Sequence, residues 1–361
     1  MSGLNKDGGL TAPADGKSLA GFRRALLGWY EAHRRDLPWR GTRDPYRIWL
    51  SEIMLQQTRV AAVLGHYRVF LERFPDVATL AAAREDAVLA AWSGLGYYRR
   101  ARMLHHCARE IVGRHGGAFP ESADAWRELP GIGRYTAAAI ASIAFGEPVA
   151  VVDGNVERVL KRIYASGLPP QQCWTRAEEL ISHKRPGDFN QAMMELGATV
   201  CLPAGPRCPV CPVQKWCGTR ADAVRELARP AKVATAGARR TGERRNGRGA
   251  GAPARRQREI WCALDERHGR VRLVKRARDA SIMAGMWELP EWTTAPHTAN
   301  GNALWRTFRH SITVTDYTVH VMRDAGGRAA ARRGRWMALD EIQQLPITGL
   351  TRKILKAGGI I

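Results

Sequence analysis

The stretch that decides the fold lies between residues 129 and 156. It opens with LPGIGRYTA at 129–137, continues into the small-residue segment AAAIASIAFG at 137–146, and closes with VVDGNV at 151–156. Two glycines one residue apart, Gly131 and Gly133, permit a tight turn. Backbone N–H groups of that turn, together with the N-terminus of the next helix, then face an anion. The sequence therefore predicts a hairpin between two helices that holds a phosphate.

On both sides of this hairpin, residues 19–228 show the pattern of an almost entirely helical domain. Apolar residues recur at helical spacing, as at Leu26, Leu27 and Tyr30, and proline or glycine interrupts the pattern between the predicted helices. Residues 1–18 are polar and rich in glycine, and we expect a disordered tail there.

The composition changes after residue 228. Residues 229–258 are rich in Ala, Gly and Arg without apolar periodicity, which indicates a flexible basic linker. Residues 259–361 show the alternation of β-strands and end in a helix near 350–357. The alternating β-branched positions include Ile312, Val314, Val319 and Val321. We therefore expect a multidomain protein, in which an all-α domain precedes a smaller α+β domain.

The charge of the chain indicates a polyanionic partner. The 361 residues carry a formal net charge of +22. The linker holds ten Lys and Arg against one acid, so about +13 remains on the predicted domains, where each neutralised phosphate favours binding. No apolar run approaches the roughly 20 residues of a membrane span, and Met1–Lys17 lacks the apolar core of a secretory signal. We expect a cytoplasmic protein that binds nucleic acid.

Four of the seven cysteines lie within 17 residues, in the pattern C-x6-C-x2-C-x5-C. They are Cys201, Cys208, Cys211 and Cys217. Four thiolates at this spacing wrap one metal centre, and thiolates suit zinc as well as iron–sulfur clusters. Zinc modules usually pair two C-x-x-C knuckles, whereas this run has one. The spacing resembles the [4Fe–4S] loop of the endonuclease III superfamily, which implies that cofactor.

The hairpin also resembles a known family once Asp153 is added. Asp153 lies 20 residues after Gly133. A hairpin followed by an aspartate at this distance is similar to the pattern of the helix-hairpin-helix DNA glycosylases. Cleaving an N-glycosidic bond requires a protonated leaving base and a stabilised sugar cation. Asp153 suits the second role as a carboxylate, and it equally suits an N-cap of a helix starting at Val156. Glu52 lies among apolar residues that would raise its pKa, although an acid on an amphipathic helix is commonly exposed.

Three further segments narrow the resemblance to the MutY adenine glycosylases. They are WLSEIMLQQT at 49–58, GLGYY at 94–98 and FNQAMM at 189–194. With the hairpin and the cysteines, the match covers nearly all of residues 19–220. The resemblance implies that Glu52 protonates adenine and handles the water, that Asp153 stabilises the cation, and that Tyr135 and Asn155 support the site.

The same resemblance implies residues that contact DNA. Gln57 would intercalate where the base has left, beside Thr58, and Tyr97 would wedge the neighbouring step. Gly131 and Gly133 would approach a phosphate. The weaker candidates for the adenine pocket are Arg35, Trp39, Arg40 and Glu195, each of which suits the core or the surface equally well.

Position 135 separates two chemistries. Relatives that also nick DNA carry a lysine there, whose amine attacks the sugar, and tyrosine cannot form the imine. We therefore expect a monofunctional glycosylase.

The C-terminal segments GMWELP at 285–290 and FRHS at 308–311 resemble the Nudix-like domain of the same family. Gly285 and Glu291 match the opening of a Nudix box, but the carboxylates that would bind magnesium are missing after residue 299, so we expect no pyrophosphate hydrolysis. The family reads 8-oxoguanine through a Phe-Ser-His loop in this domain. Here the corresponding residues are Ile312, Thr313 and Val314, so the aromatic residue and the second histidine are absent. His310 and Thr313 are the candidate readers of the lesion.

The sequence thus predicts a monomeric, nucleoid-associated enzyme that excises adenine opposite 8-oxoguanine or guanine in double-stranded DNA. A thymine-mismatch glycosylase of the same superfamily is one alternative. A non-catalytic iron–sulfur protein that binds DNA is another, and the presence of both Glu52 and Asp153 argues against it.

Overall fold

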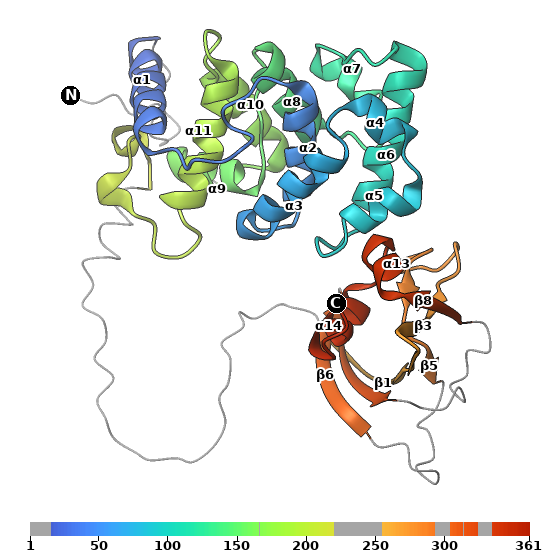
Figure 1. Cartoon of the computed structure of the whole chain (residues 1–361). Coiled ribbons are helices and arrows are strands. Elements are labelled where there is room, and N and C mark those ends of the chain that lie inside the picture. The colour runs from blue at the N-terminus through green and yellow to red at the C-terminus, as the bar shows by residue number, and fades with distance from the viewer. Residues whose placement is uncertain (1–15, 166, 220–254, 293–303, 313, 324–333) are drawn as a thin grey trace, which may run out of the picture. The chain divides into compact units, whose positions relative to one another are not determined.

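A computed structural model of the chain describes residues 16–165, 167–219, 255–292, 304–312, 314–323 and 334–361 (Figure 1). Their packing divides the chain into two compact units. The first comprises the described parts of 1–67, 76–81 and 106–237, and the second those of 68–75, 82–105 and 238–361. The described part of the chain contains no helix that is long and apolar enough to cross a bilayer.

The first unit is helical. Its helices are α1 (Gly16–His33), α2 (Pro45–Leu55), α4 (Val77–Ala82), α7 (Ala123–Arg127), α8 (Arg134–Ile140), α9 (Gly154–Ile163), α10 (Pro170–Leu180) and α11 (Pro186–Thr199). A π-helical turn, η1 (Ala141–Phe145), continues α8, and two 3₁₀ turns, η2 (Cys208–Val210) and η3 (Gln214–Trp216), lie in the cysteine loop. Helices α3 (Val60–Arg73) and α6 (Arg99–His115) contribute residues to both units.

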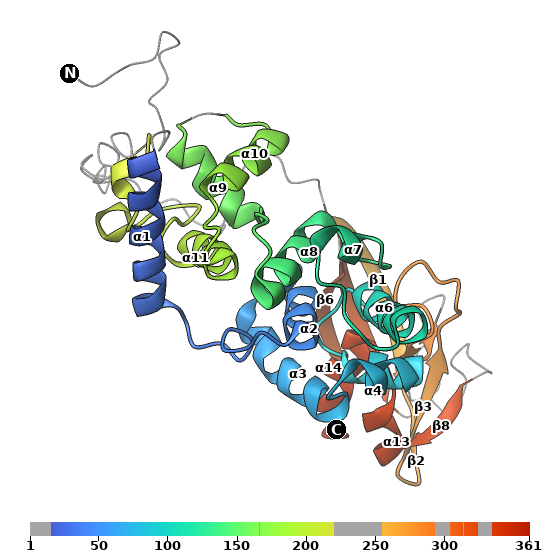
Figure 2. The same cartoon turned by 90° about the horizontal axis from the view of Figure 1, so that it is seen from above.

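Helices α1, α9, α10 and α11 surround one apolar core of the first unit, and they lie side by side in both views (Figures 1 and 2). Phe22 and Leu26 of α1 and Leu196 of α11 are fully buried in this core. Helices α9 and α11 approach closely because Gly197 has no side chain. A Cβ atom there would lie 2.6 Å from Cβ of Asn155.

Local sequence explains where the helices that carry the site begin. Asp44 caps α2 by accepting hydrogen bonds from the N–H groups of Tyr46 and Arg47, and Pro45 occupies the first turn. Helix α8 begins directly after the hairpin, and its small residues are buried. The fixed starts of α2, α8 and α9 position the side chains described below.

The second unit contains helix α5 (Glu85–Ala91) and the strands of the C-terminal region. One sheet has the order β5-β1-β7-β6, formed by β5 (Glu291–Trp292), β1 (Arg256–Leu264), β7 (Thr315–Arg323) and β6 (Leu304–Ile312). Strands β1 and β7 are parallel, and β6 pairs antiparallel with β7. The other sheet joins β2 (Glu266–Arg267), β3 (Arg270–Lys275), β4 (Trp287–Glu288) and β8 (Arg335–Ala338).

The helices α13 (Leu339–Gln344) and α14 (Gly349–Ala357) complete this region. Ile354 and Leu355 of α14 are buried against Val319 and Val321 of β7 in one core. Thr348 caps α14 by accepting a hydrogen bond from the N–H of Thr351. The expected fold class, a helical domain followed by a smaller α+β domain with a closing helix, is confirmed.

Two boundaries and one strand position differ from the expectations. Helix α1 begins at Gly16, so residues 16–18 are not part of a disordered tail. Strand β1 begins at Arg256, where backbone pairing with β7 starts, so the last three residues of the expected linker belong to the sheet. Val314 lies in the turn after β6 and is half exposed, which breaks the expected alternation. Residues 1–15 and 220–254, which hold the rest of the tail and linker, lie outside the described residues.

Candidate active site and cysteine loop

Glu52 and Tyr135 meet between helices α2 and α8. The Tyr135 hydroxyl donates a hydrogen bond of 2.8 Å to Oε2 of Glu52 and lies 3.3 Å from the sulfur of Met194 on α11. Glu52 lies in the last two turns of α2, and Tyr135 lies in the first turn of α8 directly after the hairpin. The turn at 129–133 therefore places the phenol on the carboxyl group.

The Glu52 carboxyl group is electrostatically perturbed. Glu52 is only 7% exposed. It is therefore not an exposed acid on an amphipathic helix, which was the alternative that the sequence left open. Burial raises the pKa of Glu52 to about 7, against the lowering effect of the Tyr135 hydrogen bond. The negative charge of Asp153 raises this pKa further, and the positive charge of Arg40 lowers it. A carboxyl group with this pKa is partly protonated at neutral pH.

Asp153 caps a helix, one of the two roles that the sequence left open, and its charge still acts on Glu52. Its Oδ1 atom accepts a hydrogen bond of 2.7 Å from the N–H of Val156, so it does cap α9, although the helix begins two residues earlier at Gly154. Its Oδ2 atom accepts a hydrogen bond of 3.0 Å from the side-chain amide of Asn155. The same carboxylate acts on the pKa of Glu52 and of Tyr135, so capping does not remove it from the site.

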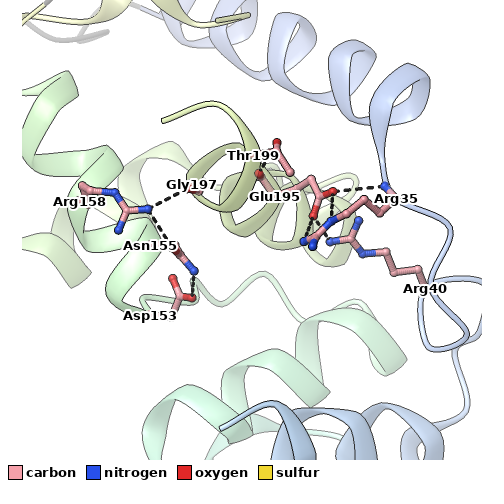
Figure 3. A network of polar contacts seen from close by, with 8 residues as sticks. All are labelled: Arg35, Arg40, Asp153, Asn155, Arg158, Glu195, Gly197 and Thr199. Carbon is pink, nitrogen blue, oxygen red and sulfur yellow. Dashed lines mark hydrogen bonds and ion pairs between the residues drawn. The ribbon is translucent and has the colours of Figure 1, made fainter. Parts of the chain in front are cut away.

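A chain of polar contacts continues from Asp153 along α9 (Figure 3). The guanidinium of Arg158 donates to Oδ1 of Asn155 at 2.8 Å and to the carbonyl of Gly197 at 2.8 Å. It also donates to the carbonyl of Cys201 at 2.9 Å, where the cysteine loop begins. We did not single out Arg158 or Met194 from the sequence. The spacing of Asn155 and Arg158, three residues apart, was the signal that both lie on one helix face.

Arg35, Arg40 and Glu195 form one ion-pair cluster (Figure 3). Arg35 donates from Nε to Oε1 and from Nη2 to Oε2 of Glu195, each at 2.7 Å, and Arg40 also donates to Oε2. Burial alone would raise the pKa of Glu195, but the hydrogen bonds from Arg35 and Arg40 outweigh it and lower the pKa to about 2. This carboxylate is therefore ionised throughout the neutral range.

Of the four residues predicted for the adenine pocket, Trp39 does not belong to this ion-pair cluster, whereas the other three form it. Trp39 is 6% exposed and packs its ring edge-on against Tyr67, with ring centroids 5.2 Å apart, so it belongs to the core. Arg40 is different, because its Nη1 atom is buried and has no hydrogen-bond acceptor among the residues that the structure describes. A buried donor without an acceptor is costly, so it indicates a place for a ligand atom.

Gln57 and Tyr97 share an unusual backbone conformation. Their φ angles are +55° and +47°, which only glycine adopts freely, and both side chains are exposed. Thr58, next to Gln57, bonds its hydroxyl to the carbonyl of Gln56 at 3.2 Å. The structure therefore holds both predicted intercalating side chains outward at strained positions.

The two hairpin glycines differ. Gly131 has a φ of +81°, so its lack of a side chain is required by the turn. Gly133 has an ordinary φ of −92°, and a Cβ atom there would meet nothing within 4 Å. The protein alone does not require glycine at 133, contrary to our expectation that both glycines serve the turn.

The four cysteines of the 201–217 loop are partly buried. All seven cysteines lie in the described part of the chain as free thiols. Burial raises the pKa of Cys211 to about 11, and the charges of the other three loop cysteines raise it further. No three His, Cys, Asp or Glu side chains of the described residues form a site for a single metal ion.

The C-terminal region places one of the two predicted lesion-reading residues. His310 lies on β6. Burial lowers the pKa of its imidazole, and the positive charge of Lys353 lowers this pKa further. Thr313 lies outside the described residues, as does the segment 293–303 in which the Nudix carboxylates are missing.

Two protein-family models match separate parts of the chain. Residues 50–182 match the HhH-GPD superfamily of base excision DNA repair proteins, and residues 260–357 match the NUDIX domain. The first range includes Glu52, Tyr135 and Asp153.

Among curated proteins, the chain is 48% identical over 221 residues to the adenine DNA glycosylase of Homo sapiens, covering 57% of this chain and 40% of that protein. It is 38% identical over 318 residues to the adenine DNA glycosylase of Arabidopsis thaliana, covering 74% of this chain and 47% of that protein. The chain thus spans less than half the length of these two curated relatives.

Among solved structures, the chain resembles a thermostable thymine-DNA glycosylase with a TM-score of 0.54 and 32% identity, over 57% of this chain and 98% of that one. An endonuclease III–DNA complex matches with a TM-score of 0.50 and 23% identity, over 57% of this chain and 98% of that one, and shows the shared fold.

Proposed function

Because the chain belongs to the HhH-GPD superfamily of base excision DNA repair proteins, we propose that it is a monofunctional adenine DNA glycosylase. Its substrate is adenine paired with 8-oxoguanine or guanine in double-stranded DNA. The observation that carries this proposal is the buried Glu52, which accepts a hydrogen bond from Tyr135 and has a pKa raised to about 7. The 48% identity to a protein named adenine DNA glycosylase supports the choice of adenine.

The two carboxyl groups suit the two halves of glycosidic hydrolysis. Glu52 keeps a proton at neutral pH and donates it to the leaving adenine, after which its carboxylate orients the attacking water. Asp153 remains a carboxylate and stabilises the positive charge that develops on the sugar. Its hydrogen bonds from Val156 and Asn155 hold that charge in place.

Tyr135 supports hydrolysis without strand cleavage. Its hydroxyl positions Glu52 at 2.8 Å, and a phenol cannot form the imine through which bifunctional relatives cleave the strand. Tyr135→Lys would introduce an amine at this position. We expect the variant to form enzyme–DNA adducts that borohydride traps, which the wild type forms poorly.

Arg40 supports a pocket for the flipped base. Its buried Nη1 donor has no acceptor among the described residues, and a ring nitrogen of the adenine supplies one. Glu195 holds this guanidinium from the other side, with Arg35 as the second partner. In this proposal Arg35 and Glu195 position Arg40, and Trp39 supports them from the core.

The DNA contacts follow from the exposed positions. Gln57 fills the space of the flipped base, Thr58 lies beside it, and Tyr97 enters the neighbouring step. Gly131 and Gly133 bring the hairpin close to a phosphate. The protein acts as a monomer on DNA in the cytoplasm, at the nucleoid.

The cysteine loop suits a [4Fe–4S] cluster bound by Cys201, Cys208, Cys211 and Cys217. Four free thiols within 17 residues, three of which raise the pKa of Cys211, provide the donor set that such a cluster prefers. When bound, the cluster supplies a rigid centre for the loop that Arg158 joins to α9. Purified protein would then contain four irons per chain, and stoichiometric zinc without iron would contradict this assignment.

The C-terminal domain serves recognition of the opposite base. The proposed readers of 8-oxoguanine are His310 and Thr313, and the domain itself has no hydrolytic role. Removing the chain beyond residue 228 would leave Glu52, Tyr135 and Asp153 in place. We expect that truncation to keep excision while losing the preference for 8-oxoguanine over guanine.

A single-turnover assay on duplexes with A:8-oxoG, A:G, A:C and G:T pairs tests the proposal. We expect adenine release opposite 8-oxoguanine and guanine. Thymine release from G:T would instead support the thymine-mismatch alternative, to which the 32% identical thymine-DNA glycosylase structure draws attention. Tight binding of all duplexes without release of any base would support the non-catalytic alternative.

A further inference from the structure

Helix α9 presents two arginines to the cysteine loop. Arg158 and Arg162 are four residues apart and therefore lie on one face of the helix. Arg158 reaches only backbone of the loop, through the carbonyl of Cys201. Arg162 reaches a sulfur atom.

The guanidinium of Arg162 is bound at three points. Nη1 lies 3.1 Å from Sγ of Cys201 and 2.7 Å from the carbonyl of Leu202, and Nη2 lies 3.0 Å from the carbonyl of Pro203. A planar guanidinium matches such a set of acceptors, whereas an ammonium group does not. The side chain is therefore fixed with its positive charge against the first cysteine of the loop.

The backbone of Arg162 contacts the other end of the same loop. Its carbonyl oxygen accepts a hydrogen bond of 3.2 Å from the N–H of Thr219 and lies 3.4 Å from Sγ of Cys217. The N–H of Gly218 donates to the carbonyl of Ile163 at 2.8 Å. A Cβ atom on Gly218 would lie 3.0 Å from that carbonyl oxygen, so the contact is close. One residue thus contacts both the first and the last cysteine.

We propose that Arg162 tunes the reduction potential of the cluster and retains its two terminal ligands, an inference that rests on the [4Fe–4S] cluster proposed above. A cation and hydrogen-bond donor at a thiolate sulfur stabilises the more negative oxidation state of a cluster. Arg162 therefore raises the reduction potential and slows oxidative loss of iron. In this role it is a positioning residue that acts through Cys201.

The test compares Arg162→Met with Arg114→Met in the full-length, iron-loaded protein. Arg114 forms an exposed pair with Glu110 on α6, so its replacement removes the same charge without touching the loop. Voltammetry gives the midpoint potential, and iron content is followed after exposure to a mild oxidant. We expect Arg162→Met to favour the oxidised state by about tenfold, which is about 59 mV for a one-electron couple, and to release iron faster. Arg114→Met should match the wild type.

The outcomes separate the two proposals. A wild type without iron overturns the cluster itself. Iron in the wild type, together with an unshifted potential and unchanged iron release in Arg162→Met, overturns only the role of Arg162. If Arg162→Met retains no iron, Arg162→Lys decides. We expect its potential to lie below that of the wild type, because lysine lacks the planar guanidinium, and a wild-type potential contradicts the proposal.

Discussion

Two buried glutamates of the helical unit, Glu52 and Glu195, have opposite electrostatics. They are 7% and 0% exposed, and burial by itself raises the pKa of both. Glu52 accepts a hydrogen bond from the neutral phenol of Tyr135, and its pKa stays raised at about 7. Glu195 accepts hydrogen bonds from two guanidinium groups, and its pKa falls to about 2. The charge of the partners, rather than the depth of burial, decides which carboxyl group keeps its proton.

Arg40 connects the two carboxyl groups. It pairs with Glu195, and its charge also lowers the pKa of Glu52. Because Glu195 pairs with this guanidinium, it offsets part of the positive charge near Glu52. Ionised Glu195 thus helps Glu52 to keep its proton.

The largest expected effect is on catalysis at Glu52. Glu52→Gln keeps the shape of the side chain but removes the acidic proton, so single-turnover excision should fall by about 10³-fold or more, or ~4 kcal/mol in the barrier. Binding to the duplex should stay near that of the wild type. Glu157→Gln, at a partly exposed pair with Lys161, is the control and should excise normally. Excision by Glu52→Gln within about tenfold of the wild type would exclude Glu52 as the acid.

The next effect is on folding at Glu195. Glu195→Ala leaves Arg35 and the largely buried Arg40 without their carboxylate, and we expect a loss of about 3 kcal/mol in the free energy of unfolding at pH 7. Because the pKa of Glu195 is lowered in the folded state, its ionisation stabilises the protein above its unfolded pKa, and this contribution is lost as the pH falls toward about 2.

Urea unfolding measures this loss. Glu179→Ala is the matched control, because Glu179 forms a half-exposed pair with Arg176 that contributes at most about 1 kcal/mol. Equal losses in the two variants would show that the Glu195 cluster has no special role in stability.

The contribution of Glu52 to the free energy of unfolding should depend on pH in the opposite direction to that of Glu195. Its pKa is raised to about 7 in the folded state, so the protein pays for ionising this carboxyl group as the pH rises through 7. Glu52→Gln cannot ionise and should be more stable than the wild type at pH 8, by up to about 3 kcal/mol, with the gain fading toward pH 4. Unfolding curves at the two pH values measure the gain. A gain of the same size at pH 4 and pH 8 would contradict the raised pKa.

The smallest effect concerns Tyr135. Excision should decline as the pH rises above about 7, because Glu52 loses its proton. Tyr135→Phe removes a hydrogen bond that lowers the pKa of Glu52, so the decline should move to higher pH while the plateau rate stays within about tenfold, or ~1.4 kcal/mol. A pH–rate profile of both proteins measures the shift. A profile that moves to lower pH would show that the phenol favours the protonated acid.

Much of the fold was predictable because it depends on local patterns. The helical periodicity around Leu26 and Tyr30, the hairpin before α8 and the cap at Asp153 each arise from residues close in the chain. The apolar neighbours of Glu52 indicated burial but left an exposed acid open, and the tertiary structure decided for burial. The start of β1 at Arg256 was missed, because a basic segment becomes a strand only when β7 provides its backbone partners.

The sequence by itself determined the chemical groups: two carboxyl groups, a phenol in place of an amine, and four closely spaced thiols. Only the tertiary structure decided how they act. It brought Tyr135 to Glu52 across 83 positions and paired Arg35 with Glu195 across 160, which separated two similar carboxyl groups into an acid and an anchor. The physical reason is that a pKa depends on burial and on the charges within a few ångströms, and neither quantity is a property of neighbours along the chain.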